Sequence, residues 1–453
     1  MAGLNNILTT AYSALMAQQA GMNVTGSNIA NAQNPNYSRQ TLKLSSATVY
    51  GSLLGTGVHL DSIQRGRDQV IDVGIWQEKA HFGYYESEDK YTAFVESVFN
   101  DLTGEGLSQF LDEFWNSWLE LSNHPENSGA RAGVSIKAKR LAIRLNNMDN
   151  QLRTLAKQSQ VELKNRTDDF NNLLKHIAKI NTQIIRDSNN AGYNNSLLDK
   201  RDSLINELST YIDLKVIFNE GGSVTLFGSN QILLDKGNSY ELEMESRNQA
   251  GQNNVYLSIH NGKELNIKDG LLKSLVEQSN ISDELKELDE IAKNLVEQVN
   301  TLHKTFFDLK GGTGKEFFNS TGIKAGSIRV KPEIINDASN IAVSKDGQNG
   351  DGAGSLDIAN VRYAKVLRNA SNTIDESYQS IVSIIGQKRR SSVDNFEIQT
   401  SVVRALENQR QSIMGVSLEE EMINLIKYQN AFSATSRFIG AVDEMLQTVI
   451  NMV

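Results

Sequence analysis

Few residues in this chain stand at the spacings that catalysis or ligand binding would require. The segment GGTGKE resembles a phosphate-binding loop, in which a glycine stands five positions before the final Gly-Lys pair and Ser or Thr follows it. Here Lys315 is followed by Glu, and Leu309 stands where the first glycine belongs. The segment therefore predicts no nucleotide site.

A second segment, DGQNGDG, resembles a calcium loop, but Gln348 and Gly350 stand where such a loop needs oxygen-rich ligands. No G-x-S-x-G turn is present that would present a nucleophilic serine. The six histidines form no pair four positions apart, as a helical metal site would need; they are His59, His81, His124, His176, His260 and His303. The sequence predicts no metal, no cofactor and no enzymatic activity.

Composition excludes further classes of protein. Lys and Arg number 45 and Asp and Glu 54, so the net charge of −9 argues against a general binder of nucleic acid or anionic membranes. Cysteine is absent, which excludes disulfides and thiolate chemistry. The N-terminus lacks the basic and apolar regions of a signal peptide, and no apolar run approaches ~18 residues. We expect no membrane insertion, and any export to proceed without a cleaved signal peptide.

The two ends of the chain carry heptad patterns, in which apolar residues recur at alternating spacings of four and three. The first 38 residues contain no charged side chain, although a surface helix normally carries Lys and Glu on its outer face. This combination predicts helices that face other protein. The expected assembly interface comprises Leu4, Leu8, Leu15, Met22, Ile29, Leu418, Met422, Leu425, Phe432, Ile439, Leu446 and Val449.

A turn is expected to close the N-terminal helix. Pro35 restricts Asn34 to extended backbone, and Asn36 tolerates a positive φ angle. The turn motif comprises Asn31, Asn34, Pro35, Asn36, Tyr37 and Arg39, the last being the first charged residue.

A capping box is expected to open the C-terminal helix. In it, Ser417 accepts a hydrogen bond from the first helical turn and Glu420 reaches back toward Ser417.

Neither end is expected to hold its shape alone. Ordering some thirty backbone residues costs more free energy than burying the apolar side chains of one such helix returns. We therefore expect both ends to be disordered in the free subunit and to fold when subunits stack. The alternative is that they form a two-helix cap on the protein's own core.

Between the ends, the hydrophobic period changes several times along the chain. A Trp-containing apolar stripe at 107–121 is expected to pack in a core. Helical periods cover 107–121, 128–187, 271–307 and 356–414, and strand patterns cover 41–46, 58–63, 212–267 and 327–331. The predicted fold class is mainly α with a small β part, with long coiled-coil-like helices in its terminal and rod domains and a small β subdomain.

Three domains are predicted from these patterns. They are a non-contiguous helical assembly domain of residues 1–40 and 415–453, a helical rod domain of 41–210, 268–307 and 355–414 with a short N-terminal β hairpin, and a small β or irregular subdomain of 211–267 and 308–354.

Several segments resemble a known family. SNIANAQNPNYSRQ is similar to the N-terminal motif of bacterial flagellar axial proteins. Four segments follow in the order typical of the hook-associated family of the hook–filament junction: GTGVHLDSIQRGRDQVIDVGIWQEK, LDEFWNSWLELSNHPENSGAR, LLDKRDSLINELS and GVSLEEEM. Asn34 and Asn36 replace the more usual Thr and Gly, and Phe318 lies only ten positions before Ile328, where longer members insert an outer β domain.

The resemblance implies a structural protein of the flagellum that joins hook to filament as a ring of packed copies. It also implies export through the flagellar type III apparatus, location outside the cell, and contact with the hook protein and the next junction protein. An export chaperone would bind the C-terminal helix at 418–453. The alternatives are another axial component, in the hook or rod, and a surface adhesin that uses the β region.

Overall fold

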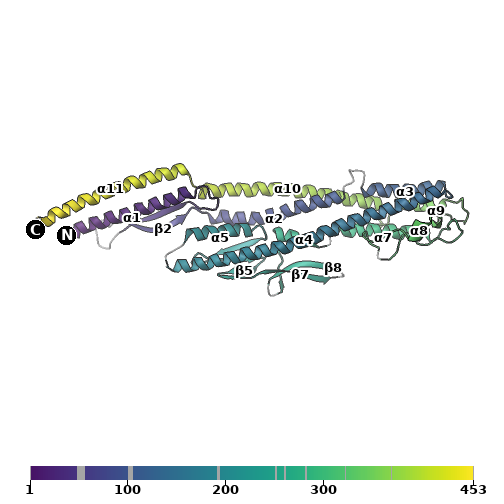
Figure 1. The fold of residues 1–453 in the computed structure, drawn as a ribbon, viewed down its shortest axis with the longest axis horizontal. Helices are drawn as coiled ribbons and strands as arrows, with labels where there is room; N and C mark the ends of the chain where they lie inside the picture. Colours follow the sequence, from purple (N-terminus) through teal and green to yellow (C-terminus); the bar gives the residue numbers. More distant parts are fainter. Residues whose placement is uncertain are drawn as a thin grey trace. The chain divides into compact units, whose positions relative to one another are not determined.

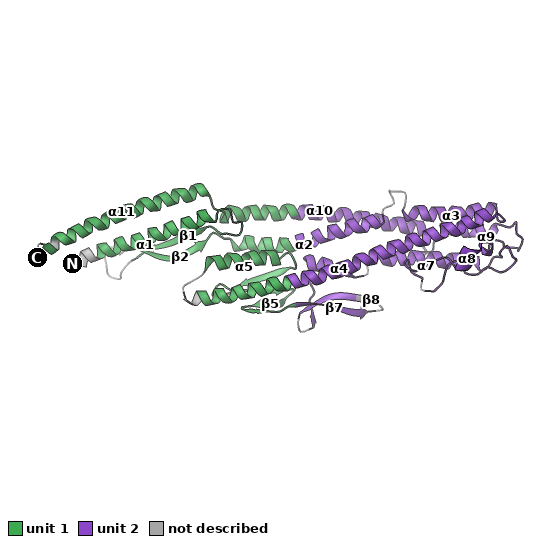
Figure 2. Cartoon of the chain, in the orientation of Figure 1, with its two compact units in different colours: residues 1–80, 170–241, 400–453 green, residues 81–169, 242–399 purple. Residues whose placement is uncertain are grey.

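The computed structural model describes residues 2–47, 57–99, 106–190, 194–249, 252–259, 262–280, 283–321, 323–368 and 370–451. The fold is mainly α with small sheets, which confirms the predicted fold class (Figure 1). The chain divides into two compact units, coloured separately in Figure 2. Unit 1 comprises residues 1–80, 170–241 and 400–453, and unit 2 comprises 81–169 and 242–399.

Unit 1 contains both ends of the chain. Its helices and strands are α1 (Ala2–Ala30), β1 (Gln40–Ser46), β2 (Val58–Arg65), α5 (Asn195–Leu208), β3 (Leu214–Phe218), β4 (Val224–Gly228), β5 (Gln231–Asp235), β6 (Asn238–Ser239) and α11 (Leu418–Asn451). Helices α2 (Gln69–Val98), α4 (Ser128–Asn190) and α10 (Ile374–Met414) have residues in both units. Strands β1 and β2 form an antiparallel hairpin, as predicted, and β3 to β6 form an antiparallel sheet in chain order.

Unit 2 contains a large hydrophobic core. Its other elements are α3 (Leu107–Asn123), β7 (Leu242–Gln249), β8 (Gln252–Ile259), β9 (Lys263–Glu264), α6 (Leu271–Ser279), α7 (Asp283–His303), α8 (Pro332–Asn336), α9 (Ala353–Asn360) and the short 3₁₀ turns η1 (Ala338–Asn340) and η2 (Val361–Tyr363). Trp115 and Trp118 of α3 are 2% and 0% exposed, and the Trp118 ring centroid lies 5.2 Å from that of Phe317. The aromatic stripe is core, as expected.

The structure divides the helix expected at 271–307 into α6 and α7. The side chain of Asn280 ends α6, because its Oδ1 accepts from the backbone amide of Val255 at 2.8 Å and its Nδ2 donates to the carbonyl of Val276 at 2.9 Å. An asparagine that bonds a neighbouring strand competes with the helical backbone pattern. The expected continuous helix was therefore wrong at this point.

The helix expected at 356–414 is also interrupted. Arg368 and Ala370 have positive φ angles, which a helix does not allow, and α10 begins only at Ile374. The strand expected at 327–331 was wrong as well, because the described residues form only an isolated bridge between Phe318 and Val330. The three-domain division stays a prediction; the two compact units cut across its boundaries, since 170–210 lies with the chain ends.

Candidate assembly interface

Small residues let α1 and α11 pack closely. Ala11, Ala17 and Val24 of α1 are 8% exposed or less. Gly21 faces the ring of Tyr428, and a Cβ atom at Gly21 would lie 2.5 Å from a ring carbon, so no larger side chain fits without a shift. The contact between the two terminal helices therefore depends on small side chains of α1.

Polar pairs show that the two helices are antiparallel. Gln18 Nε2 donates to Thr435 Oγ1 at 3.2 Å, and Asn28 Nδ2 donates to Glu421 Oε2 at 3.0 Å. Higher numbers on α1 thus meet lower numbers on α11, and both helices run side by side in Figure 1. Among the described residues of α11, Glu421 and Val442 are buried, so the contact includes a polar as well as an apolar side chain.

The described members of the predicted heptad seam are exposed or partly buried. Leu418 and Met422 are 48% and 58% exposed. The side chains of Leu4 and Val449 lie outside the described residues. The remaining members are partly buried; they are Leu8, Leu15, Met22, Ile29, Leu425, Phe432, Ile439 and Leu446. Their role in contacts between subunits stays a prediction.

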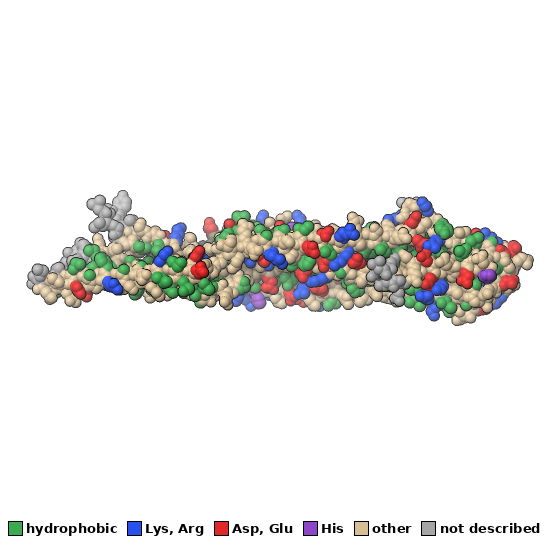
Figure 3. All heavy atoms as spheres, turned by 90° about the horizontal axis from the view of Figure 1, so that it is seen from above, with side chains coloured by type: hydrophobic (Ala, Val, Ile, Leu, Met, Phe, Trp, Pro, Cys, Tyr) green, Lys and Arg blue, Asp and Glu red, His purple; other side chains and the backbone are tan. Residues whose placement is uncertain are grey.

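Large apolar side chains are exposed on the outward faces of α1 and α11. Figure 3 shows hydrophobic side chains over the part of the surface formed by α11, with a few charged ones between them. Contiguous apolar surface of this kind marks an interaction site. The residues at least 40% exposed are Ile7, Tyr12, Met16, Leu418, Met422, Ile423, Ile426, Phe438, Met445 and Ile450.

Asn28 is the centre of a buried polar cluster at the C-terminal end of α1. Its side chain is 1% exposed and makes four hydrogen bonds, which is the full capacity of an amide. Nδ2 donates to Gln40 O at 2.9 Å and to Glu421, while Oδ1 accepts from Tyr37 Oη at 2.8 Å and from the Gln40 amide at 3.0 Å. One side chain thus joins α1, the turn segment, β1 and α11.

Arg39 supplies the charge that this cluster needs. Glu421 has a side chain only 3% exposed, and an unpaired carboxylate at that depth would be costly. Arg39 Nε lies 2.8 Å from Glu421 Oε1, and Arg39 Nη1 lies 2.8 Å from Glu420 Oε2. Arg39, the first charged residue of the chain, therefore pairs with two carboxylates in the first turn of α11.

The turn motif forms around Asn34. The amide of Tyr37 donates to Asn34 O at 3.1 Å, and the amide of Asn36 donates to Asn34 Oδ1 at 3.1 Å. Asn36 does not have a positive φ angle in this turn. Asn31 bonds through its side chain to Ser27 O at 2.9 Å. Burial of the phenol raises the pKa of Tyr37, whose hydroxyl bonds Asn28.

The predicted helix cap is half formed. Ser417 Oγ accepts from the Glu420 amide at 3.4 Å, whereas the Glu420 carboxylate pairs with Arg39. A reciprocal cap occurs instead at the start of α10, where Thr373 N donates to Glu376 Oε2 at 2.9 Å and Glu376 N donates to Thr373 Oγ1 at 3.1 Å. The Thr-x-x-Glu spacing of this second cap was visible in the sequence.

A second buried charge cluster holds the segment after the turn. Ser38 is fully buried and donates through N and Oγ to the Asp199 carboxylate of α5, at 3.1 and 2.7 Å. Arg65 of β2 lies 2.7 Å from Asp199 and 3.0 Å from Asp202. These residues come from segments that the family resemblance had marked, but sequence reasoning did not pair them.

Arginines surround Asp202 within this cluster. Burial alone would raise the pKa of the Asp202 carboxyl, but the neighbouring charges of Arg201, Arg67 and Arg65 outweigh it and lower that pKa. Arg67 also pairs with Asp72 at 2.8 Å. Burial alone would lower the pKa of Arg67, but the hydrogen bond to Asp72 and the charges of nearby carboxylates outweigh burial and raise it. The cluster is paired internally, as a structural ion network requires.

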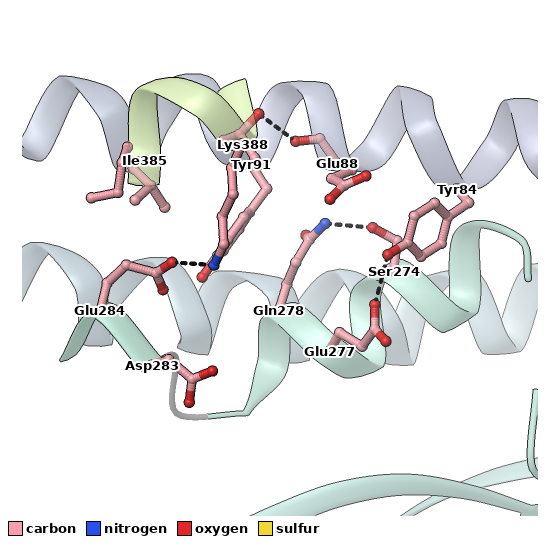
Figure 4. A pocket seen from close by; sticks show the side chains of 12 residues that line it. Tyr84, Glu88, Tyr91, Ser274, Glu277, Gln278, Asp283, Glu284, Ile385 and Lys388 are labelled. Atoms are coloured by element: carbon pink, nitrogen blue, oxygen red, sulfur yellow. Dashed lines mark hydrogen bonds and ion pairs between the residues drawn. The ribbon is translucent and has the colours of Figure 1, made fainter. Parts of the chain in front are cut away.

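A separate cavity of about 450 Å³ lies in unit 2 between α2, α6, α7 and α10 (Figure 4). Its charged and polar side chains bond one another: Tyr84 donates to Glu277 at 3.0 Å and Lys388 to Glu284 at 2.6 Å. Desolvation raises the pKa of the Glu88 carboxyl on the same wall. None of the predicted site residues lines this cavity.

The two segments that resemble ligand loops are held by hydrogen bonds to other groups of the protein. Gly314 packs against His303, whose Nδ1 lies 2.5 Å from Lys315 O, and Asp346 and Asp351 accept hydrogen bonds from backbone amides of their own loop. Across the described ranges, no three His, Cys, Asp or Glu side chains are placed to hold a metal ion. No helix in that part of the chain is long and apolar enough to cross a bilayer.

Three segments of the sequence match models of known protein families. Residues 92–318 match the model of the flagellar hook-associated protein FlgK helical domain. Residues 8–37 match that of the flagella basal body rod protein, and residues 407–452 match that of the flagellar basal body rod FlgEFG protein C-terminal region. The terminal matches overlap α1 with the turn segment after it, and the end of α10 with α11.

Whole proteins and a solved structure are similar over most of the chain. Flagellar hook-associated protein 1 of Bacillus subtilis is 30% identical, over 98% of this chain and 97% of that protein. The Escherichia coli protein of the same name is 24% identical, over 99% of this chain and 100% of that protein. The flagellar hook junction protein FlgK from Burkholderia pseudomallei matches the fold with a TM-score of 0.65 and 12% identity, over 75% of this chain and 100% of that chain.

Proposed function

Because the chain belongs to the flagellar hook-associated protein 1 family, we propose that it forms a ring of packed subunits between the hook and the next junction protein of the bacterial flagellum. It is a structural component of the flagellum and assembles with other flagellar axial proteins. Its work is mechanical coupling, without turnover of a substrate and without a cofactor.

The observation that carries this proposal is the distribution of side chains on α1 and α11. Gln18 and Asn28 of α1 bond Thr435 and Glu421 of α11, and Gly21 faces Tyr428. Ile423, Ile426 and Phe438 of α11, by contrast, are at least 50% exposed. A helix pair normally buries its larger apolar residues between its own helices. Copies of the chain packed side by side would remove this outer apolar surface from water.

The proposed assembly domain consists of residues 1–40 and 415–453, and the seam predicted from the heptads contributes to the subunit contacts. The polar cluster of Asn28, Arg39 and Glu421 holds the two helices in register so that the outer surface has one shape. The remaining residues belong to the rod domain and the β subdomain in the proposed division.

Export completes the proposal. The chain is exported through the flagellar type III apparatus without a cleaved signal peptide and is then outside the cell. Before assembly the exposed apolar residues of 418–453 need a cover, and an export chaperone on this helix supplies it. Deletion of 418–453 should abolish chaperone binding, and an unchanged affinity would refute this part.

A matched pair of variants tests the interface. Ile426→Glu places a charge on the proposed contact, and Ile136→Glu places one on α4 at a similar exposure, 54% against 58%. In a strain that lacks the protein, Ile426→Glu should leave hooks without filaments in electron micrographs, whereas Ile136→Glu should restore filaments. Normal filaments with Ile426→Glu would contradict the proposed contact surface.

The family alternative, a hook or rod component, is supported by the names of the models matched at the two ends. The helical-domain match over 92–318 favours the junction instead. The deletion strain separates the two: loss of a rod or hook component removes the hook itself, while loss of a junction subunit leaves hooks that carry no filament.

A further inference from the structure

Methionines occupy the outward faces of the terminal helices. Met16, Met422 and Met445 are 51%, 58% and 56% exposed. Because the chain contains no cysteine, thioether sulfur is the only sulfur available for oxidation. Met148 and Met414 are 0% and 2% exposed, so they form an internal comparison.

We propose that Met16, Met422 and Met445 are three separate oxidation-sensitive positions, and that their oxidation decides whether a free subunit can join the assembly. The inference rests on the proposed function, in which the outer faces of α1 and α11 become subunit contacts. It applies to the unassembled subunit, since packing would cover these sulfur atoms.

The chemistry requires only hydrogen peroxide. The thioether sulfur attacks one peroxide oxygen, so that an S–O bond forms, the O–O bond breaks and hydroxide leaves. The proton on the attacked oxygen then passes to that hydroxide, which gives water. Sulfur is oxidised by two electrons to the sulfoxide, and the peroxide is reduced to water. Accessible sulfur atoms react first, so the three outward methionines should oxidise before Met148 and Met414.

Oxidation should weaken binding between subunits because the contact buries these methionine side chains. Methionine fills irregular apolar contacts because its side chain is flexible and polarisable. Its sulfoxide is a polar acceptor, and burying such a group without a hydrogen-bond donor is unfavourable. An oxidised subunit should therefore bind at least about tenfold more weakly, whereas a subunit already in the ring is protected.

The proposal is first tested by measuring which methionines of the full-length protein become oxidised. Subunits are treated with hydrogen peroxide, and each methionine peptide is quantified by mass spectrometry over time. Met16, Met422 and Met445 should oxidise well before Met148 and Met414. Equal rates for the two groups would overturn the inference.

Binding is then measured with labelled subunits and isolated hooks of the same bacterium. Peroxide should weaken binding of the wild-type protein by at least about tenfold, and methionine sulfoxide reductases of both epimer specificities should restore it. The triple variant Met16→Leu, Met422→Leu, Met445→Leu should bind hooks and resist peroxide. Met244→Leu, which changes a methionine 37% exposed on β7, should remain as sensitive as wild type.

Two outcomes distinguish a failure of the proposed function from a failure of this inference alone. If untreated wild-type subunits fail to bind hooks, the proposed function fails and this inference falls with it. If untreated subunits bind and peroxide changes nothing, or if the triple leucine variant is equally sensitive, only the inference is overturned. Met422→Gln provides an independent test, because its polar amide should weaken binding to hooks without any oxidant.

Discussion

Arg39 and Glu421 are 382 positions apart in the sequence, yet Arg39 Nε lies 2.8 Å from Glu421 Oε1. The pair joins the segment after the first helix to the first turn of the last helix. Since the Glu421 side chain is only 3% exposed, its charge depends on this arginine and on the amide of Asn28. The two ends of the chain are thus connected by a buried ionic contact.

Removing the arginine should loosen the start of α11. Arg39→Ala leaves the buried carboxylate without a cation, and losing one partner of a buried pair costs about 3 kcal/mol or more. Hydrogen exchange of the amides at 418–425 should accelerate accordingly. Arg437→Ala, at an exposed position on the same helix, is the control and should leave these rates unchanged.

Asn28→Asp should be more harmful than its small change in shape suggests. The substitution turns the donor to Glu421 into a second carboxylate, so a hydrogen bond becomes a like-charge contact in a buried place. We expect a loss of roughly 3 kcal/mol in the opening free energy of this cluster. Asn34→Asp is the matched control, because Asn34 uses only its side-chain oxygen, to accept from Asn36. Similar exchange rates for both variants would refute the assigned role of Asn28.

Two glycines of α1 should respond to alanine in opposite directions. A Cβ atom at Gly21 meets the Tyr428 ring at 2.5 Å, whereas Gly26 has nothing within 4 Å. Gly26→Ala should stabilise the helix by up to about 1 kcal/mol through propensity alone. Gly21→Ala should lower stability by about 1 kcal/mol or more through overpacking. Thermal melts followed by circular dichroism compare them, and Tyr428→Ala should restore the Gly21→Ala variant if the ring is the cause.

His303 should make unit 2 sensitive to mild acid. Its Nδ1–H donates to Lys315 O and its Nε2 accepts from the Ala342 amide at 2.9 Å, so the neutral ring fits and a second proton does not. Burial lowers the pKa of His303 from 6.5 to about 4. The unfolded chain therefore binds a proton that the folded chain refuses, and stability falls as pH drops from about 6.5 toward 4.

The expected loss between pH 7 and pH 5 is about 2 kcal/mol, at about 1.4 kcal/mol per pH unit over most of that interval. Denaturant unfolding followed by tryptophan fluorescence measures it, since the Trp118 ring centroid lies 6.4 Å from His303. A His124→Gln variant, changed at an exposed histidine, should keep the full pH dependence. An equally steep dependence after His303→Gln would show that another group is responsible.

Amide exchange on the isolated full-length subunit tests the expected disorder of the ends. We expect fast exchange over 6–17 and 437–451, where apolar side chains await neighbouring copies. Slower exchange is expected near Asn28, Ser38 and Arg39, because these residues bond Glu421 and Asp199 within the same subunit. Uniformly slow exchange through 1–35 would contradict folding upon assembly.

Local patterns in the sequence were sufficient for much of the fold. The heptads predicted helices at both ends, and the spacing of Leu141, Leu145 and Met148 predicted the long helix α4, in which all three are fully buried. Interruptions were harder to see, because the break after α6 depends on a bond from Asn280 to β8. Helical periodicity extends over neighbouring residues, whereas such a bond depends on a distant strand.

The candidate assembly interface, like the fold, could be predicted only in part from local patterns in the sequence. The sequence by itself determined that the first 38 residues carry no charge, that both ends have an apolar stripe, and that a turn stands before Arg39. Only the tertiary structure decided that Arg39 meets Glu421, that Ser38 meets Asp199, and that Gly21 meets the ring of Tyr428. Periodicity reveals which face of a helix avoids water, but the partner of a buried charge depends on which distant segments the completed fold brings together.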